Sequence, residues 1–167
     1  MVRRNIRTSS QKVKETAFNT LVRPNLEYAC AAWNPSQKCH IDKLQAIQRR
    51  GARYVYNRYH NRSSPTSMLQ ALKWESLASR RTKLQLCIFY KMHYKLIDVK
   101  FPSYVHLALE RSRRTHSLAY FEFYCQTELY QSTFYPNMIS TWNSLSPSTV
   151  EATSLDQFKT RLASLSL

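Results

Sequence analysis

The stretch His40–Tyr59, HIDKLQAIQRRGARYVYNRY, carries the most regular helical pattern in this chain of 167 residues. Along it, mainly apolar side chains recur at steps of three and four residues: Ile41, Leu44, Gln48, Ala52, Val55 and Tyr59. This spacing is typical of an amphipathic helix with one buried face. The basic residues of the stretch fall mainly off that stripe, so the pattern predicts a helix whose outer surface is cationic.

Glycine is almost absent from the chain, which contains only Gly51, where average usage would give about 12 glycines. Phosphate-binding loops of the P-loop and dinucleotide-binding types need several glycines, so both types are excluded. Sandwiches, barrels and doubly wound sheets also depend on glycine-containing turns. The composition therefore favours a mainly α fold. Because Gly51 lies inside the predicted helix, we expect it to mark a point of close helix packing.

The first 35 residues predict two helical pieces. Ser9 or Ser10 can cap the first helix. The apolar face of that helix is expected to consist of Val13, Ala17 and Leu21. Pro24 is expected to interrupt the helix, and a second piece follows over residues 25–33.

Two further helices are predicted in the middle of the chain. A short helix begins at Pro65 and ends near Trp74, because proline suits the first turn of a helix. A long helix follows over about residues 76–97, with an apolar line formed by Leu77, Leu84, Ile88 and Met92. Basic side chains are expected to cover the rest of its surface.

The last third of the chain has a different composition. Aromatic side chains are frequent over 116–135, and this stretch is predicted to be extended or hairpin-like. Helices are expected over 134–145 and after Ser154, the latter with one face formed by Leu155, Phe158 and Leu162. We therefore expect a helical, basic region over 1–110 and a C-terminal extension over 111–167, partly extended and ending in a helix.

Charge is the second strong signal in the sequence. The chain has 25 Lys and Arg against 10 Asp and Glu, a net charge of +15. Residues 1–62 carry +10, residues 63–114 carry +7 and residues 115–167 carry −2. A polyanionic partner relieves the self-repulsion of such a surface. Nucleic acid is the commonest partner of this kind, and the alternatives are an anionic membrane surface and a solvated basic face without a partner.

Arginine and lysine neutralise phosphates, and aromatic side chains between them can stack on bases. The candidate nucleic-acid-binding residues are Arg49, Arg50, Arg53, Arg58, Arg80, Arg81, Lys83, Arg111, Arg113 and Arg114. Weaker candidates for stacking are Tyr54, Tyr56 and Tyr59. Of these, Tyr59 fits the core equally well, while Tyr54 fits an ordinary surface position. Three tryptophans are expected to anchor the core: Trp33, Trp74 and Trp142.

No constellation for catalysis or metal binding stands out. The three aspartates are isolated in the sequence, whereas a two-metal polymerase needs converging carboxylates. The histidines lack HExxH spacing, and Cys39-His40 with Cys30 matches no zinc-finger spacing. We therefore expect no catalytic residue, no metal and no cofactor. The four cysteines are expected to be free thiols in a reducing compartment, with Cys30 and Cys87 as buried apolar fillers.

No apolar run reaches the ~18 residues that cross a membrane. Residues 1–14 are rich in arginine and serine but are followed by no apolar segment of a secretory signal. We therefore expect a protein that is not secreted, is nuclear or cytoplasmic, and has no membrane partner.

Several blocks resemble, in order, the region that follows the palm in reverse transcriptases of non-LTR (LINE-type) retrotransposons of the jockey-like clades. The first block is KETAFNTLVRPNLEYACAAWNP (Lys14–Pro35), which is similar to the family's L-V-R-P-x-L-E-Y and W-x-P segment. The second is IDKLQAIQRRGARYV (Ile41–Val55), which resembles a helix ending Q-R-R-x-x-R. The third is MLQALKWESLASRRTKLQL (Met68–Leu86), which resembles L-x-x-L-x-W-x-x-L-x-x-R-R.

The closing blocks follow in the same order. They are SRRTHSL, STFYPNMISTWNSLS and SLDQFKTRL, at 112–118, 132–146 and 154–162. The second of these resembles S-F-F-P-x-x-I-x-x-W-N-x-L-P, with Ser146 where the family usually has proline. The resemblance thus covers nearly the whole chain from about Arg3.

The resemblance implies a thumb-like helical bundle and a C-terminal extension that grips the template–primer duplex. In the family the fingers and the palm lie upstream, and the palm holds the catalytic aspartates that use Mg²⁺. The implied function is that of a fragment of an RNA-directed DNA polymerase. Such a fragment binds RNA or an RNA–DNA duplex without sequence preference and has no activity by itself, and the upstream polymerase domain is a further partner.

Other interpretations stay open from the sequence. One is a domesticated or orphan helical module that binds a protein through the aromatic segment Tyr120–Trp142. Another is an open reading frame from a decayed element. A standalone enzyme is a third, which primer extension with Mg²⁺ would reveal.

Overall fold

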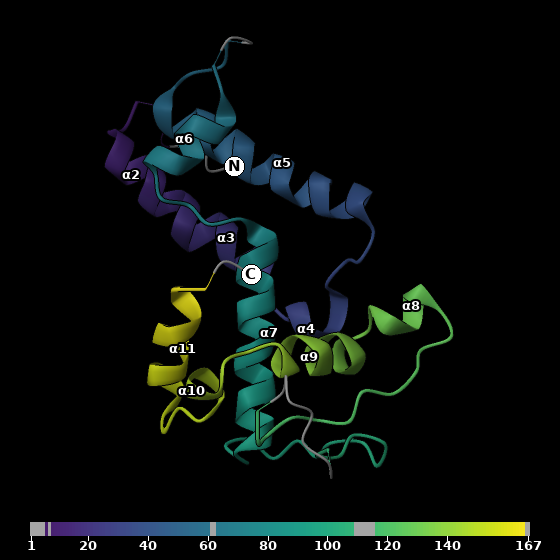
Figure 1. Ribbon diagram of the computed structural model, residues 1–167. Helices are drawn as coiled ribbons and strands as arrows, with labels where there is room; N and C mark the ends of the chain where they lie inside the picture. Colours follow the sequence, from purple (N-terminus) through teal and green to yellow (C-terminus); the bar gives the residue numbers. More distant parts are fainter. Residues whose placement is uncertain (1–5, 7, 61–62, 109–115, 166–167) are drawn as a thin grey trace. The chain divides into compact units, whose positions relative to one another are not determined.

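The computed structural model describes residue 6 and residues 8–60, 63–108 and 116–165. These residues are mainly helical (Figure 1), which confirms the fold class expected from the glycine-poor sequence. The chain divides into two compact units, unit 1 over Met1–Arg81 and unit 2 over Thr82–Leu167. The division lies inside a helix, whereas the change in composition suggested a boundary near residue 110.

Unit 1 begins with a helical run that changes its hydrogen-bond pattern along the way. The helix α2 spans Gln11–Ala17, and Ser10 caps it by accepting a hydrogen bond from the amide of Val13. The π-helical turn η1 (Phe18–Val22) follows and leads into α3 (Arg23–Glu27), which has Pro24 in its first turn. Pro24 lies inside this run, and the π-helical turn just before it is where the hydrogen-bond ladder adjusts to the amide that proline lacks. The predicted interruption at Pro24 is therefore wrong, and the run ends instead at Ala29, whose φ is 50°.

The buried face of this run also differs from the prediction. Phe18 and Lys14 are buried, whereas Val13 and Leu21 are largely exposed. Phe18 is the largest apolar side chain of the run, and it turns toward Trp74 and Gly51 in the core of unit 1. The helix is therefore rotated away from the stripe that the aliphatic residues suggested.

The remaining helices of unit 1 are α4 (Cys30–Trp33), α5 (Lys38–Tyr56) and α6 (Pro65–Ala71). The long amphipathic helix and the short helix at Pro65 are thereby confirmed, and Ser64 caps α6. α6 packs against α5 (Figure 1). Four residues of α5 on or beside the predicted stripe are buried: Gln48, Gly51, Ala52 and Val55.

Three aromatic residues of unit 1 lie elsewhere than predicted. Tyr54 is buried, and its hydroxyl donates a hydrogen bond to the carbonyl of Ile6 at 3.0 Å. Tyr59 lies beyond the end of α5, which the left-handed Asn57 terminates, and it is exposed. Trp33 is 38% exposed, so it does not anchor the core as Trp74 does.

The core of unit 1 is built around Phe18. Its ring stacks on Trp74, with the ring centroids 4.6 Å apart and 16° between the ring planes. The ring also lies against Gly51, where an added Cβ would collide with three ring carbons of Phe18. The missing side chain at Gly51 therefore lets η1 approach α5, which agrees with the close packing expected for the single glycine.

Two glutamines of α5 hold the turn that precedes α7 (Leu77–His93). Gln48 donates from Nε2 to the carbonyl of Glu75 at 2.8 Å, and Gln45 accepts from the amide of Leu77 at 3.2 Å. Gln45 also donates to Oε1 of Gln48 at 2.6 Å. Buried polar groups need such partners, which explains why a glutamine occupies a place in the apolar stripe.

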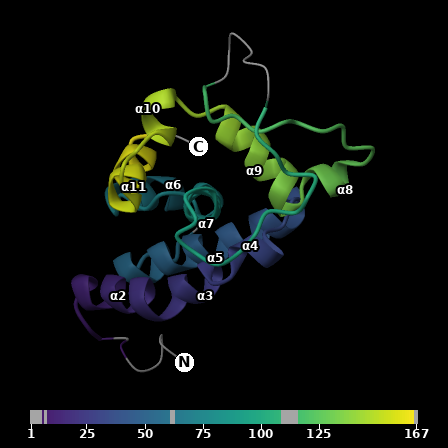
Figure 2. The same cartoon turned by 90° about the horizontal axis from the view of Figure 1, so that it is seen from below.

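Unit 2 contains most of α7, followed by α8 (Glu128–Gln131), α9 (Phe134–Asn143), α10 (Pro147–Val150) and α11 (Leu155–Ala163). α10 packs against α11 (Figure 2). Ser154 caps α11, and the burial of Phe158 and Leu162 confirms the face predicted for it. Trp142 of α9 is fully buried, with its ring centroid 5.2 Å from that of Phe89 on α7.

α7 buries only part of the apolar line predicted for it: Leu77 and Met92 are buried as expected. Leu86, Phe89 and Tyr90 are buried, whereas Leu84 is exposed and Ile88 is half-buried. Aromatic rings bury more area than aliphatic side chains, so they decide which face of the helix turns inward. The helix also ends at His93, short of the predicted 97.

The predicted extended segment is reduced to a single bridge. Within the described part of 94–127, the only strand-like pairing is an isolated antiparallel bridge between Leu107 and Tyr120. The side chain of Asn143 on α9 donates to the carbonyl of Tyr120 at 2.8 Å and accepts from its amide at 2.9 Å. The indole of Trp142 donates to the carbonyl of Leu118 at 2.9 Å. Side chains of α9 therefore pair with this backbone where a hairpin was expected.

The contact between Gly51 and Phe18 predicts that Gly51→Ala destabilises unit 1. Alanine raises helix propensity by about 1 kcal/mol, but overpacking a filled core costs about 1–3 kcal/mol. We expect a net loss of stability in urea unfolding followed by circular dichroism. The penalty should shrink when Gly51→Ala is combined with Phe18→Leu, and a stabilised Gly51→Ala variant would contradict the close packing.

A half-buried histidine predicts that unit 2 loses stability in acid. His93 Nδ1 lies 2.7 Å from the hydroxyl of Tyr120, and burial, with His116 nearby, lowers the pKa of His93 below its ordinary 6.5. The folded state thus favours neutral His93, so its contribution is complete above pH 6.5 and is lost as the pH falls through the lowered pKa. Urea midpoints at pH 5.5 and 7.5 should differ less for His93→Gln than for the wild type, and an equal difference would refute this assignment.

Candidate nucleic-acid interface

The exposed side of α5 carries three of the predicted arginines. Arg49 and Arg50 are exposed, and Arg53 is half-buried. Arg49 and Arg53 are four residues apart, so they lie on one side of the helix about 6 Å apart along its axis. Asp42 is also exposed, seven residues before Arg49, and therefore lies on the same side two turns away. We call Arg49, Arg50 and Arg53 the α5 arginine face.

None of these three arginines forms an ion pair with another described residue. Their charges are therefore available to an external anion. Arg58 is likewise exposed, just after the left-handed Asn57 that ends the helix. Its amide donates to the carbonyl of Arg53 at 3.0 Å, which ties the backbone of Arg58 to the last turn of α5.

Arg80 is bound inside unit 1 by a carboxylate. Its Nε and Nη2 donate to the two oxygens of Glu27 on α3, at 2.5 Å and 3.0 Å. The bond to Glu27 raises the pKa of Arg80, and the Glu27 side chain is 13% exposed. A bidentate pair of this kind holds two helices in register, and it leaves Arg80 little charge to offer a phosphate.

Arg81 is buried, which corrects the prediction that it covers the outer surface of α7. Its Nε donates to Oδ1 of Asn34 at 2.8 Å, and its guanidinium lies over the ring of Trp33, 5.9 Å from the centroid. The thiol of Cys30 donates to the Arg81 carbonyl at 3.8 Å. Burial lowers the pKa of Arg81. The guanidinium thus binds its own chain through an amide and an aromatic face.

The two sequence blocks that contain these groups meet in unit 1. Glu27 and Asn34 come from the block at Lys14–Pro35, and their partners Arg80 and Arg81 come from the block at Met68–Leu86. Arg80 and Arg81, the paired arginines of the block at Met68–Leu86, therefore stabilise the fold. A partner carboxylate or amide spaced tens of residues away leaves no local sequence pattern, so the sequence could not show this.

The other predicted residues do not join the α5 arginine face. Lys83 is half-buried and belongs to unit 2. Arg111, Arg113 and Arg114 lie outside the described residues. On α5 itself, Lys43 is exposed, and helical spacing places it on the same side as Arg50. Lys43 was left out of the predicted site, although its position off the apolar stripe could have indicated it.

The charge is concentrated in one of the two units. Unit 1 contains 16 Lys and Arg and 4 Asp and Glu, whereas unit 2 contains 9 and 6. Unit 1 thus carries +12 of the net +15. Three of its cations are turned inward, namely Lys14, Arg80 and Arg81, and Lys14 lies 5.2 Å from the ring centroid of Tyr54.

The remaining chemistry of the described residues is sparse. No three His, Cys, Asp or Glu side chains among them are grouped as metal ligands. Burial raises the pKa of Cys30 and of Cys87, so both thiols stay protonated near neutral pH. Cys30 is buried as predicted, while Cys87 is half-buried, and all four cysteines are free. Within the described ranges, no helix combines the length and the apolar character of a membrane span.

Comparison with known proteins identifies no relative. No protein-family model, no curated protein and no solved structure matches the chain. The resemblance to retrotransposon reverse transcriptases therefore depends on the sequence blocks alone and stays a prediction.

The opposite environments of Arg80 and Arg50 predict opposite consequences of the same substitution. Arg80→Gln leaves Glu27 without its partner and should cost about 1–3 kcal/mol of stability. Arg50→Gln changes an exposed side chain and should stay within about 0.5 kcal/mol of the wild type. Urea unfolding of the two variants at one pH and salt concentration measures the difference, and equal stabilities would show that the Arg80–Glu27 pair contributes nothing.

Proposed function

We propose that this chain is a fragment of a non-LTR retrotransposon reverse transcriptase that binds template–primer nucleic acid through its phosphates. The fragment corresponds to the thumb and the region after it, and it performs no polymerase chemistry by itself. The observation that carries the proposal is the α5 arginine face, whose cations have no acidic partner among the described residues. The ordered sequence blocks supply the family, and the charge of unit 1 supplies the class of ligand.

The proposed binding does not depend on base sequence. Guanidinium groups spaced by one helical turn neutralise phosphates and release counterions, which gives affinity without reading bases. The strong positive charge of unit 1 also attracts a polyanion over a distance, so association is fast at low salt. An RNA–DNA duplex is the ligand that the resemblance implies.

A second candidate function is protein binding through the aromatic part of unit 2. The observation that favours it is the exposure of large apolar side chains, 88% at Tyr124 and 74% at Leu129. Tyr120 and Trp142 are themselves buried, so the predicted surface Tyr120–Trp142 is reduced to the residues between them. Co-purification of a stoichiometric protein partner, lost in Tyr124→Ala, would favour this function.

The proposal predicts a salt-dependent affinity for an RNA–DNA duplex that depends on α5. The logarithm of the association constant should fall linearly with the logarithm of salt concentration. Each of Arg49→Gln and Arg50→Gln should weaken binding and reduce the slope by about 1. Fluorescence anisotropy of a labelled blunt duplex over a series of salt concentrations measures both quantities.

Lys159→Gln is the matched control for this experiment. It removes one exposed positive charge from unit 2 and should change neither the affinity nor the slope appreciably. Micromolar or weaker binding of the wild type without a salt slope would overturn the proposal. Equal slopes for the wild type and for Arg49→Gln and Arg50→Gln would exclude the α5 arginine face as the binding surface.

A further inference from the structure

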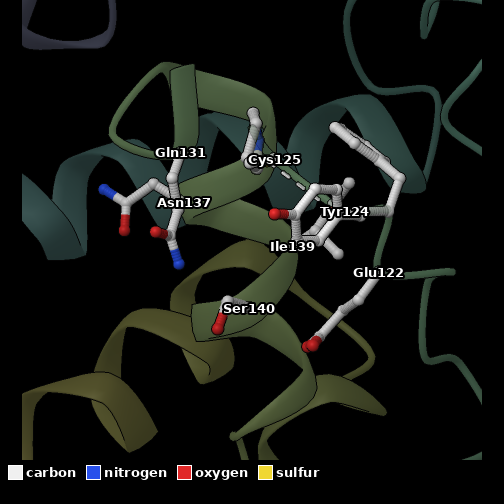
Figure 3. A pocket seen from close by; sticks show the side chains of 9 residues that line it. Glu122, Tyr124, Cys125, Gln131, Asn137, Ile139 and Ser140 are labelled. Atoms are coloured by element: carbon white, nitrogen blue, oxygen red, sulfur yellow. Dashed lines mark hydrogen bonds between the residues drawn. The ribbon is translucent and has the colours of Figure 1, made fainter. Parts of the chain in front are cut away.

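Unit 2 contains a pocket that the fold itself does not fill (Figure 3). It lies between residues 122–125 and the helices α8 and α9, and its volume is about 380 Å³. This volume is near the lower end of the range of about 300–1,000 Å³ found for small-molecule sites. The pocket therefore suits a group as small as a single nucleobase.

The pocket offers apolar surface to a flat group. Phe123, Pro136 and Ile139 line it, and Ile139 is 1% exposed, so the pocket reaches the core of unit 2. Tyr124 also lines it, and its ring is almost entirely exposed. An exposed aromatic ring beside apolar side chains stabilises a planar aromatic ligand by stacking.

The polar side chains of the pocket are available for hydrogen bonds. Gln131, Asn137 and Ser140 make no side-chain hydrogen bond within the described part of the chain. Glu122 accepts one hydrogen bond, from Nδ2 of Asn143 at 3.1 Å, through Oε1. In Figure 3 the two amides lie on one side of the pocket and the Glu122 carboxylate on the other. A bound group would therefore face the amides of Gln131 and Asn137 at one edge and the Glu122 carboxylate at the opposite edge.

The charge of the lining decides which part of a nucleic acid can enter. No lysine or arginine lines the pocket, and Glu122 is negative, so a phosphate is repelled. A nucleobase is neutral and flat and carries N–H donors and carbonyl acceptors on its edge. We infer that this pocket binds one unpaired nucleobase, with guanine preferred, between Tyr124 and the Glu122 carboxylate.

The preference for guanine follows from the carboxylate. Guanine presents a ring N–H and an exocyclic amino group side by side, so two donors face the two oxygens of Glu122. The amides of Gln131 and Asn137 can donate to its carbonyl oxygen and ring nitrogen. This inference deepens the proposed function and rests on it, because it adds a single-stranded nucleotide to a duplex held by unit 1.

The test compares two RNA–DNA duplexes. One is blunt, and the other carries a single-stranded overhang that consists of four thymines and one central guanine. The wild-type chain should bind the overhang duplex about tenfold more tightly than the blunt duplex. Tyr124→Ala should abolish most of this gain. Glu122→Gln keeps an acceptor for Asn143. In this variant the affinity for the duplex with the guanine overhang should fall to that for a duplex with an all-thymine overhang.

Tyr28→Ala is the matched control, because Tyr28 is 80% exposed and lies in unit 1. It should leave the ratio of overhang to blunt affinity unchanged. A ratio of one for the wild type, or a ratio unchanged in Tyr124→Ala, would overturn the inference while blunt-duplex binding upholds the proposed function.

A second measurement distinguishes a failure of the pocket assignment from a failure of the proposed duplex binding. Guanosine, which has no phosphate, is titrated into the wild-type chain and into Tyr124→Ala while tyrosine fluorescence is followed. Saturable quenching in the wild type and none in the variant supports the pocket even if no duplex is bound. Equal responses of the two chains would overturn the pocket assignment whatever the duplex experiment shows.

Discussion

The contact of the Phe18 ring with both Gly51 and Trp74 is the constraint on which unit 1 depends. It fixes which face of the first helical run turns inward and leaves Val13 and Leu21 in solvent. It also fixes the rotation of α5 about its axis. Because Gly51 must face Phe18, Arg49 and Arg50 must face away from it. The same contact that closes the core therefore exposes the arginines.

The cations of unit 1 differ in environment, and the environment determines what each can do. Two guanidinium nitrogens of Arg80 donate to the Glu27 carboxylate, and Arg81 and Lys14 lie over aromatic rings. Removing a charge from water is costly unless such partners replace the water. These three side chains therefore bind groups of their own chain, whereas Arg49 and Arg50 are exposed and stay hydrated.

The helices that could be predicted from the sequence are those with a regular repeat of apolar residues and a capping residue next to their first turn. Ser10, Ser64 and Ser154 cap helices as serine residues before such patterns suggest. The prediction failed on which face of α2 was buried, because Phe18 turns inward there. It also failed on half of the line predicted for α7, where Phe89 and Tyr90 are buried in place of Leu84 and Ile88. It also failed on Arg80 and Arg81, since Glu27 and Asn34 are more than 40 residues away in the chain. The exposure of Arg49 and Arg50 follows the sequence pattern because the surroundings of these side chains are set within one helix.

The burial of Arg81 has a consequence for searches of sequence collections. In the sequence, the arginine pair of the block at Met68–Leu86 suggested nucleic-acid binding, yet its guanidinium groups bind Glu27 and Asn34 of the same chain. Chains that keep this pair while losing the exposed arginines of α5 would still be retrieved by such a signature. Such a pair would then report only that the helical packing persists, and it would carry no information about a ligand.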